Sequence, residues 1–518
     1  MSRALNRRVF LASSAAVASG LALQSAAPAS AATSTPRVPD IDVRKAARQD
    51  PSEATLTEAV VLMRRGKLTS ATLTEAYLER IKQYDTTYQA YAEVTGEAAL
   101  AAARKADRGQ GAGGVLRGIP LCIKDNYFTK GVPTRCNSYI FEDFVPDEDA
   151  TAVARLKAAG GIVLGKGQMG PLATTRATQP NGTVTTVNAW TPDDPSVDPG
   201  GSSTGPACSV AGRMASSSIG TQTGGSIVLP SNQQNLTGLK PTMGRVSIHG
   251  IIPLSFTRDH AGPLARDAMD AALMLQVMAG PDSQDPRTLG LPAVPDLIKA
   301  ATPVVAKGVR MRRATKIGVP TDFLSAQKQL RGAFLDTLDS IPGATLVEVA
   351  YPADWTLLTG TFNAARLAER TEPFRHWLRA DPAKFGVSLL TWLQGLMLSG
   401  DEWITAQRAK NHLLREVLDG VMDSCDVILQ TGPVPFDILG LPEIGFPIGF
   451  DSGGVPVGAI LGGQPYEEDR LLEVTAAYQA VTDWHTRRPA DPTSATTLMR
   501  AATARPQLSA EEAAEASA

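Results

Sequence analysis

The chain has 518 residues, of which 43% are hydrophobic and 20% charged, a balance typical of a folded globular protein and not of a disordered one. Its 50 Lys and Arg residues nearly balance 52 Asp and Glu residues, so the net charge is −2 and a nucleic-acid partner is not expected. The four cysteines include no Cys-x-x-Cys pair, and the five histidines lack zinc-site spacing, so we expect neither a metal site nor a disulfide scaffold.

The first 31 residues have the pattern of an export signal. Arg7-Arg8 provides a basic start that is similar to a twin-arginine signal, a mildly apolar stretch covers residues 9–23, and Ala29-Ser30-Ala31 fits a cleavage site. The apolar stretch is too short to span a bilayer. We therefore expect a secreted protein that uses the twin-arginine export machinery, begins near Ala32 and has no stable membrane insertion in its mature form.

The following elements alternate between helix and strand. Residues 32–51 are rich in Pro and charge and indicate a linker, after which Thr55-x-x-Glu58 is the capping box of a first helix. A short apolar run ends at Lys124 and is typical of a buried strand. Residues 149–159 predict a helix, and residues 162–164 predict the next strand. Buried strands alternating with helices favour an α/β fold.

The second half of the chain is predicted from the same signals. Residues 281–297 indicate a loop, residues 326–425 are mostly helical in pattern, and Gly440 to Gly463 holds strand-like apolar runs between Gly and Pro. A last helix precedes Pro489, and residues 490–518 are Ala-, Thr- and Glu-rich, as in a disordered tail. The predicted folded domain therefore covers residues 52–489.

Three segments carry residues with chemical potential. They are Lys124 at its strand end, the Gly200–Gly205 segment and the Gly220–Ile227 segment. A serine hydroxyl needs a base to act as a nucleophile, and a buried neutral lysine can serve where histidine is scarce. Glycines before a serine let successive N–H groups point into one concavity, which suits an oxyanion. Each segment alone is ordinary, since most lysines lie on the surface and Gly-Gly-Ser is usually a turn.

Together and in this order, the segments resemble the amidase signature family. Residues 196–228 are similar to its Ser- and Gly-rich signature, residues 116–126 to its lysine segment, and residues 238–247 to the stretch that follows the signature. The resemblance implies a single-domain α/β/α sandwich with a large mixed β-sheet. It also implies hydrolysis of amides without metal or cofactor, through an acyl-enzyme.

The resemblance assigns roles residue by residue. Ser226 would be the nucleophile, Ser202 the bridging serine and Lys124 the base, and Ser203 would be a supporting hydroxyl. The implied oxyanion hole consists of the backbone N–H groups of Thr223, Gly224, Gly225 and Ser226. The sequence departs from the common pattern at Gln222, where many members have Asp, and at Val228, where many have Arg. Neither departure removes a member of the triad.

Several alternatives stay open. Gly201-Ser202-Ser203-Thr204-Gly205 also matches the Gly-x-Ser-x-Gly elbow of α/β-hydrolases, in which Ser203 would be the nucleophile, although loop-forming residues precede it. Within the family, the chain could be an esterase, a peptide amidase or the glutaminase subunit of a tRNA-dependent amidotransferase, which the export signal argues against. A non-enzymatic binding protein on the same scaffold is a further alternative.

The substrate is the least determined feature. We expect residues 326–425 to line the pocket with mainly apolar side chains, although Arg366, Glu369 and Arg375 could face inward. The apolar candidates are Phe334, Leu357, Leu358, Phe362, Phe374, Trp377, Trp392, Leu396 and Met397. This composition favours neutral aliphatic or aryl amides as substrates, cleaved into a carboxylate and ammonia or an amine. We expect the protein to be a monomer or homodimer.

Overall fold

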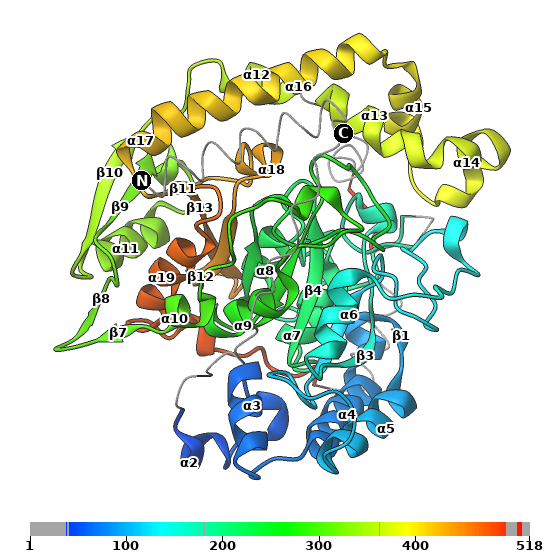
Figure 1. The fold of residues 1–518 in the computed structure, drawn as a ribbon, viewed down its shortest axis with the longest axis vertical. Coiled ribbons are helices and arrows are strands. Elements are labelled where there is room, and N and C mark those ends of the chain that lie inside the picture. Colours follow the sequence, from blue (N-terminus) through cyan, green and yellow to red (C-terminus); the bar gives the residue numbers. More distant parts are fainter. Residues whose placement is uncertain (1–37, 39–40, 180–181, 362, 494–504, 510–518) are drawn as a thin grey trace.

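An 11-stranded mixed sheet forms the centre of the computed structural model, which describes residues 38, 41–179, 182–361, 363–493 and 505–509 (Figure 1). Most neighbouring strands are antiparallel, but β2 runs parallel to β3 and β4, and β9 runs parallel to β10 and β11. In order across the sheet, the strands are β1 (Tyr91–Val94), β3 (Ile162–Gly167), β2 (Pro120–Lys124), β4 (Ser217–Gln222), β6 (His260–Ala265), β5 (Thr237–Lys240), β12 (Glu443–Phe450), β13 (Pro456–Gly463), β11 (Val427–Gln430), β9 (Thr315–Pro320) and β10 (Ala344–Val349). A separate hairpin pairs β7 (Val304–Val305) with β8 (Val309–Arg310).

Helices cover both faces of this sheet. On β13, a Cβ added at Gly458 would meet Asn232 of α8 (Val228–Gln233), whereas one added at Gly463 would meet Leu471 of α19 (Glu468–Gln479). Positions that differ by an odd number point to opposite faces of a strand, so α8 and α19 lie on opposite sides. The predicted α/β/α sandwich with a large mixed sheet is therefore confirmed.

The remaining helices form three groups. The N-terminal group lies outside the sheet at the bottom of Figure 1 and comprises α2 (Val43–Ala46), α3 (Leu56–Arg64), α4 (Ser70–Tyr88) and α5 (Gly96–Asp107). The central group is α6 (Thr151–Ala158), α7 (Thr204–Ala211), α9 (Ala268–Met278) and α10 (Leu297–Ala301). The third group is α11 (Lys328–Asp339), α12 (Trp355–Thr361), α13 (Asn363–Thr371), α14 (Arg375–Ala380), α15 (Leu390–Met397), α16 (Gly400–Arg415), α17 (Met422–Ser424) and α18 (Phe436–Leu439).

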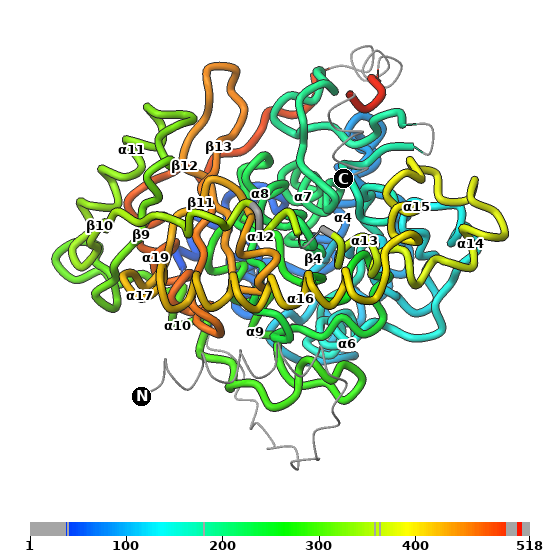
Figure 2. Tube along the Cα trace, turned by 90° about the horizontal axis from the view of Figure 1, so that it is seen from above, coloured from blue at the N-terminus to red at the C-terminus, as the bar shows by residue number. Residues whose placement is uncertain are grey.

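Helix α16 connects two distant parts of the molecule. In both views it crosses from the side of β9 and β10 to the side of α14 and α15 (Figures 1 and 2). Its first turn is closed by a capping box between Ser399 and Glu402. At the α14 and α15 end of this crossing, Trp392 of α15 packs in one cluster with Leu172 from the first half of the chain.

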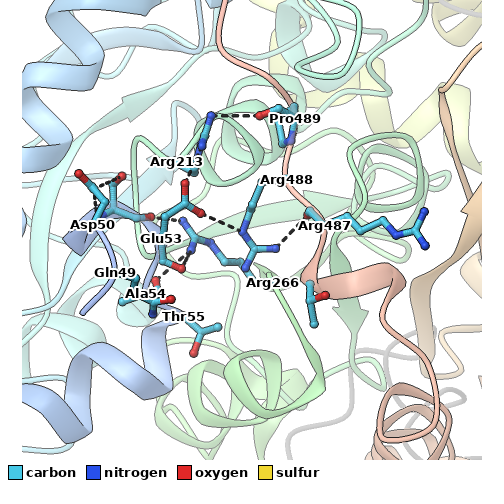
Figure 3. A network of polar contacts seen from close by, with 12 residues as sticks. Gln49, Asp50, Glu53, Ala54, Thr55, Arg213, Arg266, Arg487, Arg488 and Pro489 are labelled. Carbon is cyan, nitrogen blue, oxygen red and sulfur yellow. Dashed lines mark hydrogen bonds and ion pairs between the residues drawn. The ribbon is translucent and has the colours of Figure 1, made fainter. Parts of the chain in front are cut away.

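A network of arginines, here called the terminal clasp, joins the segment before α3 to the segment that follows α19 (Figure 3). Arg213 Nη1 lies 2.6 Å from Glu53 Oε1, and Arg213 Nη2 donates to Asp491 and to the Pro489 carbonyl oxygen. Arg80 also pairs with Asp491. Arg266 donates to backbone carbonyl oxygens of residues 52–54, which places the segment before α3 against the sheet.

The structure is more extensive at both ends than the sequence predicts. Helix α2 lies within the stretch predicted as a linker, and Asp491 belongs to the terminal clasp although it lies in the predicted tail. Gln507 forms a β-bridge with Thr183. Short polar segments of this kind are ordered by tertiary contacts, which a local pattern does not reveal. The predicted export signal lies outside the described residues, in which no helix has the length and apolar character needed to span a bilayer.

Candidate active site

Lys124 is the last residue of β2 and is completely buried. Its Nζ lies 2.8 Å from Ser202 Oγ, 2.9 Å from Thr221 Oγ1 and 3.4 Å from the Thr221 carbonyl oxygen. Strands β2 and β4 are parallel neighbours, so their carboxyl ends bring Lys124 and Thr221 to the same edge of the sheet. The predicted Lys124–Ser202 contact is therefore present.

Burial changes the acid–base chemistry of Lys124. It lowers the pKa of the amine from 10.5 to about 7, because the charged form loses its hydration, and the negative charge of Asp259 opposes this shift only in part. Near neutral pH a substantial fraction of the amine is therefore unprotonated. An unprotonated amine in contact with a serine hydroxyl can accept its proton.

Ser202 is held on a tightly packed loop. The Gly201–Ser202 peptide bond is cis, and the Ser202 carbonyl oxygen accepts from Gly170 N at 3.1 Å. Gly200 has φ +78°, and a Cβ there would lie 2.3 Å from Pro230 Cα, so no larger residue fits. Since Pro230 belongs to α8, this packing places the Ser202 loop against the helix that directly follows Ser226.

Ser226 lies on the loop between β4 and α8, here called the nucleophile loop (residues 223–226). Ser226 is partly exposed and Gly224 is exposed, in contrast to the buried Ser202. Within the described part of the chain, the backbone N–H groups of Gly224, Gly225 and Ser226 have no protein acceptor. Thr223 anchors the loop, because its Oγ1 donates to Asp259 Oδ1 at 2.5 Å. The loop thus presents an accessible hydroxyl beside unpaired donors.

Ser203 does not have the surroundings of a nucleophile. It is buried at the start of α7, and its hydroxyl donates to the Thr221 carbonyl oxygen at 3.2 Å. Turns and not a strand precede it, so the strand–turn–helix geometry of the Gly-x-Ser-x-Gly elbow is missing from this described segment. Ser203 instead braces the end of β4, beside Lys124 and Ser202.

Two charged side chains that the sequence did not single out, Arg258 and Asp437, lie next to Gly224. A Cβ added at Gly224 would be 3.9 Å from Arg258 Nη2 and 4.0 Å from Asp437 Oδ2, and these two side chains form an ion pair. Burial and the positive charge of Arg258 lower the pKa of Arg366 to about 9 and that of Arg370 to about 10. Arg366 and Arg370 therefore lie near enough to Arg258 for their charges to interact with it, and Arg258 and Asp437 lie beside the loop.

The expected apolar wall is only partly present. Phe374, Trp377 and Trp392 pack into an aromatic cluster that also contains Leu172, close to the Ser202 loop. Phe334 is instead part of the main core, where it packs against Tyr478, and Met397 is 84% exposed. These two assignments were wrong because an apolar helical pattern does not say which element covers it. Phe362 and the side chains of Leu357 and Leu358 lie outside what the structure describes.

Other candidate groups are not assembled into sites. All four cysteines are free and buried. Among the described residues, no group of three or more His, Cys, Asp or Glu side chains is arranged to hold a metal ion.

Comparisons with known proteins agree with this geometry. The sequence profile of the Amidase family matches residues 72–433. Two glutamyl-tRNA(Gln) amidotransferase subunits, from Chloroflexus aggregans and Methylococcus capsulatus, are each 34% identical to the chain, over 84% of its length and 98% of theirs.

Solved structures give the same family. Peptide amidase from Stenotrophomonas maltophilia superimposes with a TM-score of 0.74 at 28% identity, over 85% of this chain and 98% of the other. An amidase family protein from Bacillus anthracis superimposes with a TM-score of 0.73 at 26% identity, over 94% and 98% of the two chains. These enzymes act on carbon–nitrogen bonds, and the chain belongs to the same amidase signature family.

Proposed function

We propose that the chain hydrolyses amides through an acyl-enzyme on Ser226, with Ser202 as the bridging hydroxyl and Lys124 as the base. The observation that carries this proposal is the 2.8 Å contact between Ser202 Oγ and a buried lysine whose pKa is about 7. Lys124 takes a proton from Ser202 while Ser202 takes one from Ser226, and Ser226 Oγ then attacks the amide carbon.

The nucleophile loop has a role in the same step. Negative charge develops on the carbonyl oxygen during the attack, and the N–H groups of residues 223–226 supply donors for it. The proton returns through Ser202 to the leaving nitrogen, and the C–N bond breaks. Water then attacks the acyl-enzyme, loses its proton along the same route, and frees the carboxylate and Ser226.

We propose neutral aliphatic or aryl amides as the first substrate class, because a buried aromatic cluster packs beside the Ser202 loop and makes this side of the site apolar. A second class is favoured by a specific observation. Beside Gly224, Asp437 pairs with Arg258, whereas Arg366 and Arg370, whose charges interact with Arg258, form no salt bridge within the described residues. An amide that also carries an anionic group would supply the missing negative charge.

The alternatives of an esterase, a peptide amidase and the glutaminase subunit of an amidotransferase use the same three residues. The relatives named as amidotransferase subunits keep the glutaminase alternative open. The proposed export signal, by contrast, favours an enzyme that acts outside the cytoplasm on a small molecule, as a monomer or homodimer.

The test combines variants with a substrate panel. Ser226→Ala and Lys124→Ala are each expected to lower kcat by about three orders of magnitude or more, with Ser202→Ala also strongly impaired. The panel pairs each neutral amide with an analogue that carries a carboxylate, and adds glutamine, peptide amides and aryl esters. Unchanged turnover in Ser226→Ala would refute the mechanism.

The arginine cluster gives the panel a matched control. Arg366→Gln is expected to raise KM for the carboxylate-bearing analogues and to leave KM for neutral amides unchanged. If the wild-type enzyme prefers neutral amides and Arg366→Gln affects both classes equally, the second substrate class is wrong.

A further inference from the structure

Four buried polar side chains from four strands meet behind the nucleophile loop. Glu443 of β12 is central: Gln222 Nε2 of β4 donates to its Oε2 at 2.9 Å, and Gln430 Nε2 of β11 donates to its Oε1 at 3.2 Å. Lys240 Nζ of β5 lies 3.5 Å from Glu443 Oε2. None of these four side chains has more than 2% of its surface exposed. We call them the Gln222 network.

The other end of the Gln222 amide holds the backbone that follows Ser226. Gln222 Oε1 accepts from Ile227 N at 3.0 Å and from Val228 N at 3.1 Å. These are the first two amides after Ser226, at the start of α8. Gln222 directly precedes the nucleophile loop, and its side-chain oxygen binds the two backbone N–H groups that directly follow the loop. Gln222 therefore connects the two ends of the loop.

The Glu443 carboxylate determines which way the Gln222 amide faces. Burial raises the pKa of Glu443 to about 8, although the positive charge of Lys240 opposes this shift. Glu443 Oε2 accepts from the NH₂ group of Gln222, so the Gln222 oxygen is left for the two backbone N–H groups. A reversed amide would place its oxygen against the carboxylate and its NH₂ against two donors, and would lose all three hydrogen bonds. A carboxylate at position 222 would accept from the loop but would remove the amide donor to Glu443 Oε2 in a buried site.

We propose that Gln222 is the positioning residue of the nucleophile loop, with Glu443 fixing the orientation of its amide, so that this pair sets the direction of the oxyanion-binding N–H groups. This inference rests on the proposed function for its catalytic meaning. It explains how the chain tolerates the absence of the usual Asp and Arg at positions 222 and 228. A neutral amide directed by Glu443 binds the Val228 backbone in their place.

The first test removes the hydrogen bonds but keeps the length of the side chain. Gln222→Met is expected to lower kcat at least roughly tenfold, as for the loss of an oxyanion donor, with KM changed less than about threefold. The matched control is Gln479→Met on α19, because buried Gln479 likewise accepts from a backbone amide (Ala268 N, 2.9 Å) and donates to a side chain (Thr237 Oγ1, 3.0 Å). The control is expected to lose stability but to keep kcat.

The second test exchanges donor and acceptor. Gln222→Glu alone is expected to lower kcat at least as much as Gln222→Met. In the double variant Gln222→Glu/Glu443→Gln, the new carboxylate accepts from Ile227, Val228 and the new amide, and most of kcat should return. A purely structural role of Gln222 would lower stability without a selective effect on kcat and without this rescue.

Hydrogen exchange separates this proposal from the proposed function. The amides of Ile227 and Val228, which donate to Gln222 Oε1, should exchange faster in Gln222→Met and regain protection in the double variant, whichever residue is the nucleophile. If Ser226→Ala keeps full activity while Gln222→Met speeds exchange, the mechanism fails but the positioning role stands. Unchanged exchange and kcat in Gln222→Met, or no rescue in the double variant, would overturn the positioning role.

Discussion

Lys124→Met tests whether the buried lysine is neutral, through the stability of the folded state. An unfolded lysine has a pKa of 10.5, whereas burial lowers the folded value to about 7, so the folded state binds fewer protons between these values. Lys124 therefore destabilises the fold most at low pH, by about 5 kcal/mol at pH 6 and only about 1 kcal/mol at pH 9.5, from the linkage relation.

The expected effect of the variant changes sign with pH. Methionine removes this cost but also the contacts of Nζ with Ser202 and Thr221, which are worth about 2 kcal/mol together. Lys124→Met should thus be more stable than the wild type by about 3 kcal/mol at pH 6 and slightly less stable at pH 9.5. The lost contacts contribute equally at both pH values, so they do not affect the difference between the stability change at pH 6 and that at pH 9.5.

Urea unfolding followed by tryptophan fluorescence at pH 6, 8 and 9.5 measures the difference. Exposed Lys67 provides the control, since Lys67→Met should show no such dependence on pH. A stability difference between Lys124→Met and wild type that stays constant across this range would mean that Lys124 is charged in the folded protein. In that case it could not act as the base.

Three further predictions concern the pH profile, the terminal clasp and the N-terminus. The value of kcat/KM should fall about tenfold per pH unit below pH 7, because protonated Lys124 cannot accept a proton, and a rate that is flat from pH 5 to 8 would contradict this. Asp491→Asn should lower the free energy of unfolding by about 1 kcal/mol, a value reduced by partial exposure. Although burial opposes it, the hydrogen bond from Arg80 holds the pKa of Asp491 below 3.8, so urea unfolding should show that difference above pH 4 and its disappearance in more acidic solution. Mass spectrometry of the exported protein should find an N-terminus near Ala32, and an intact Met1 on the abundant form would argue against export.

Features that depend on neighbours in the sequence could be predicted. The capping box of Thr55 and Glu58 is present, and β2 ends at Lys124 with its amine buried. Glycines before Ser202 and Ser226 indicated loops, and the structure places both serines on loops, with Gly200 and Gly225 at positive φ. Such signals depend on spacing and backbone sterics, which the sequence carries directly.

Features that depend on distant partners could not be predicted. Glu443 contacts Gln222 across 221 positions, and nothing near either residue indicates the other. Arg366 was named as a residue that could face inward, but the sequence did not indicate Arg258 and Asp437, which pair beside Gly224 across 179 positions. The sequence therefore indicated the loop that carries Ser226 but not the ion pair beside it.

The terminal clasp also bears on how the chain may be connected. Because Arg213 contacts both Glu53 and Asp491, the segment before α3 and the segment after α19 lie within reach of one side chain. The tip of the β12–β13 hairpin, at residues 452–454, is exposed and projects from the molecule (Figure 2). A circular permutant that joins residue 493 to residue 41 and begins at Gly453 should therefore keep every strand pairing of the central sheet. The new link closes a short gap, and the new ends lie at an exposed loop, so neither change moves a strand.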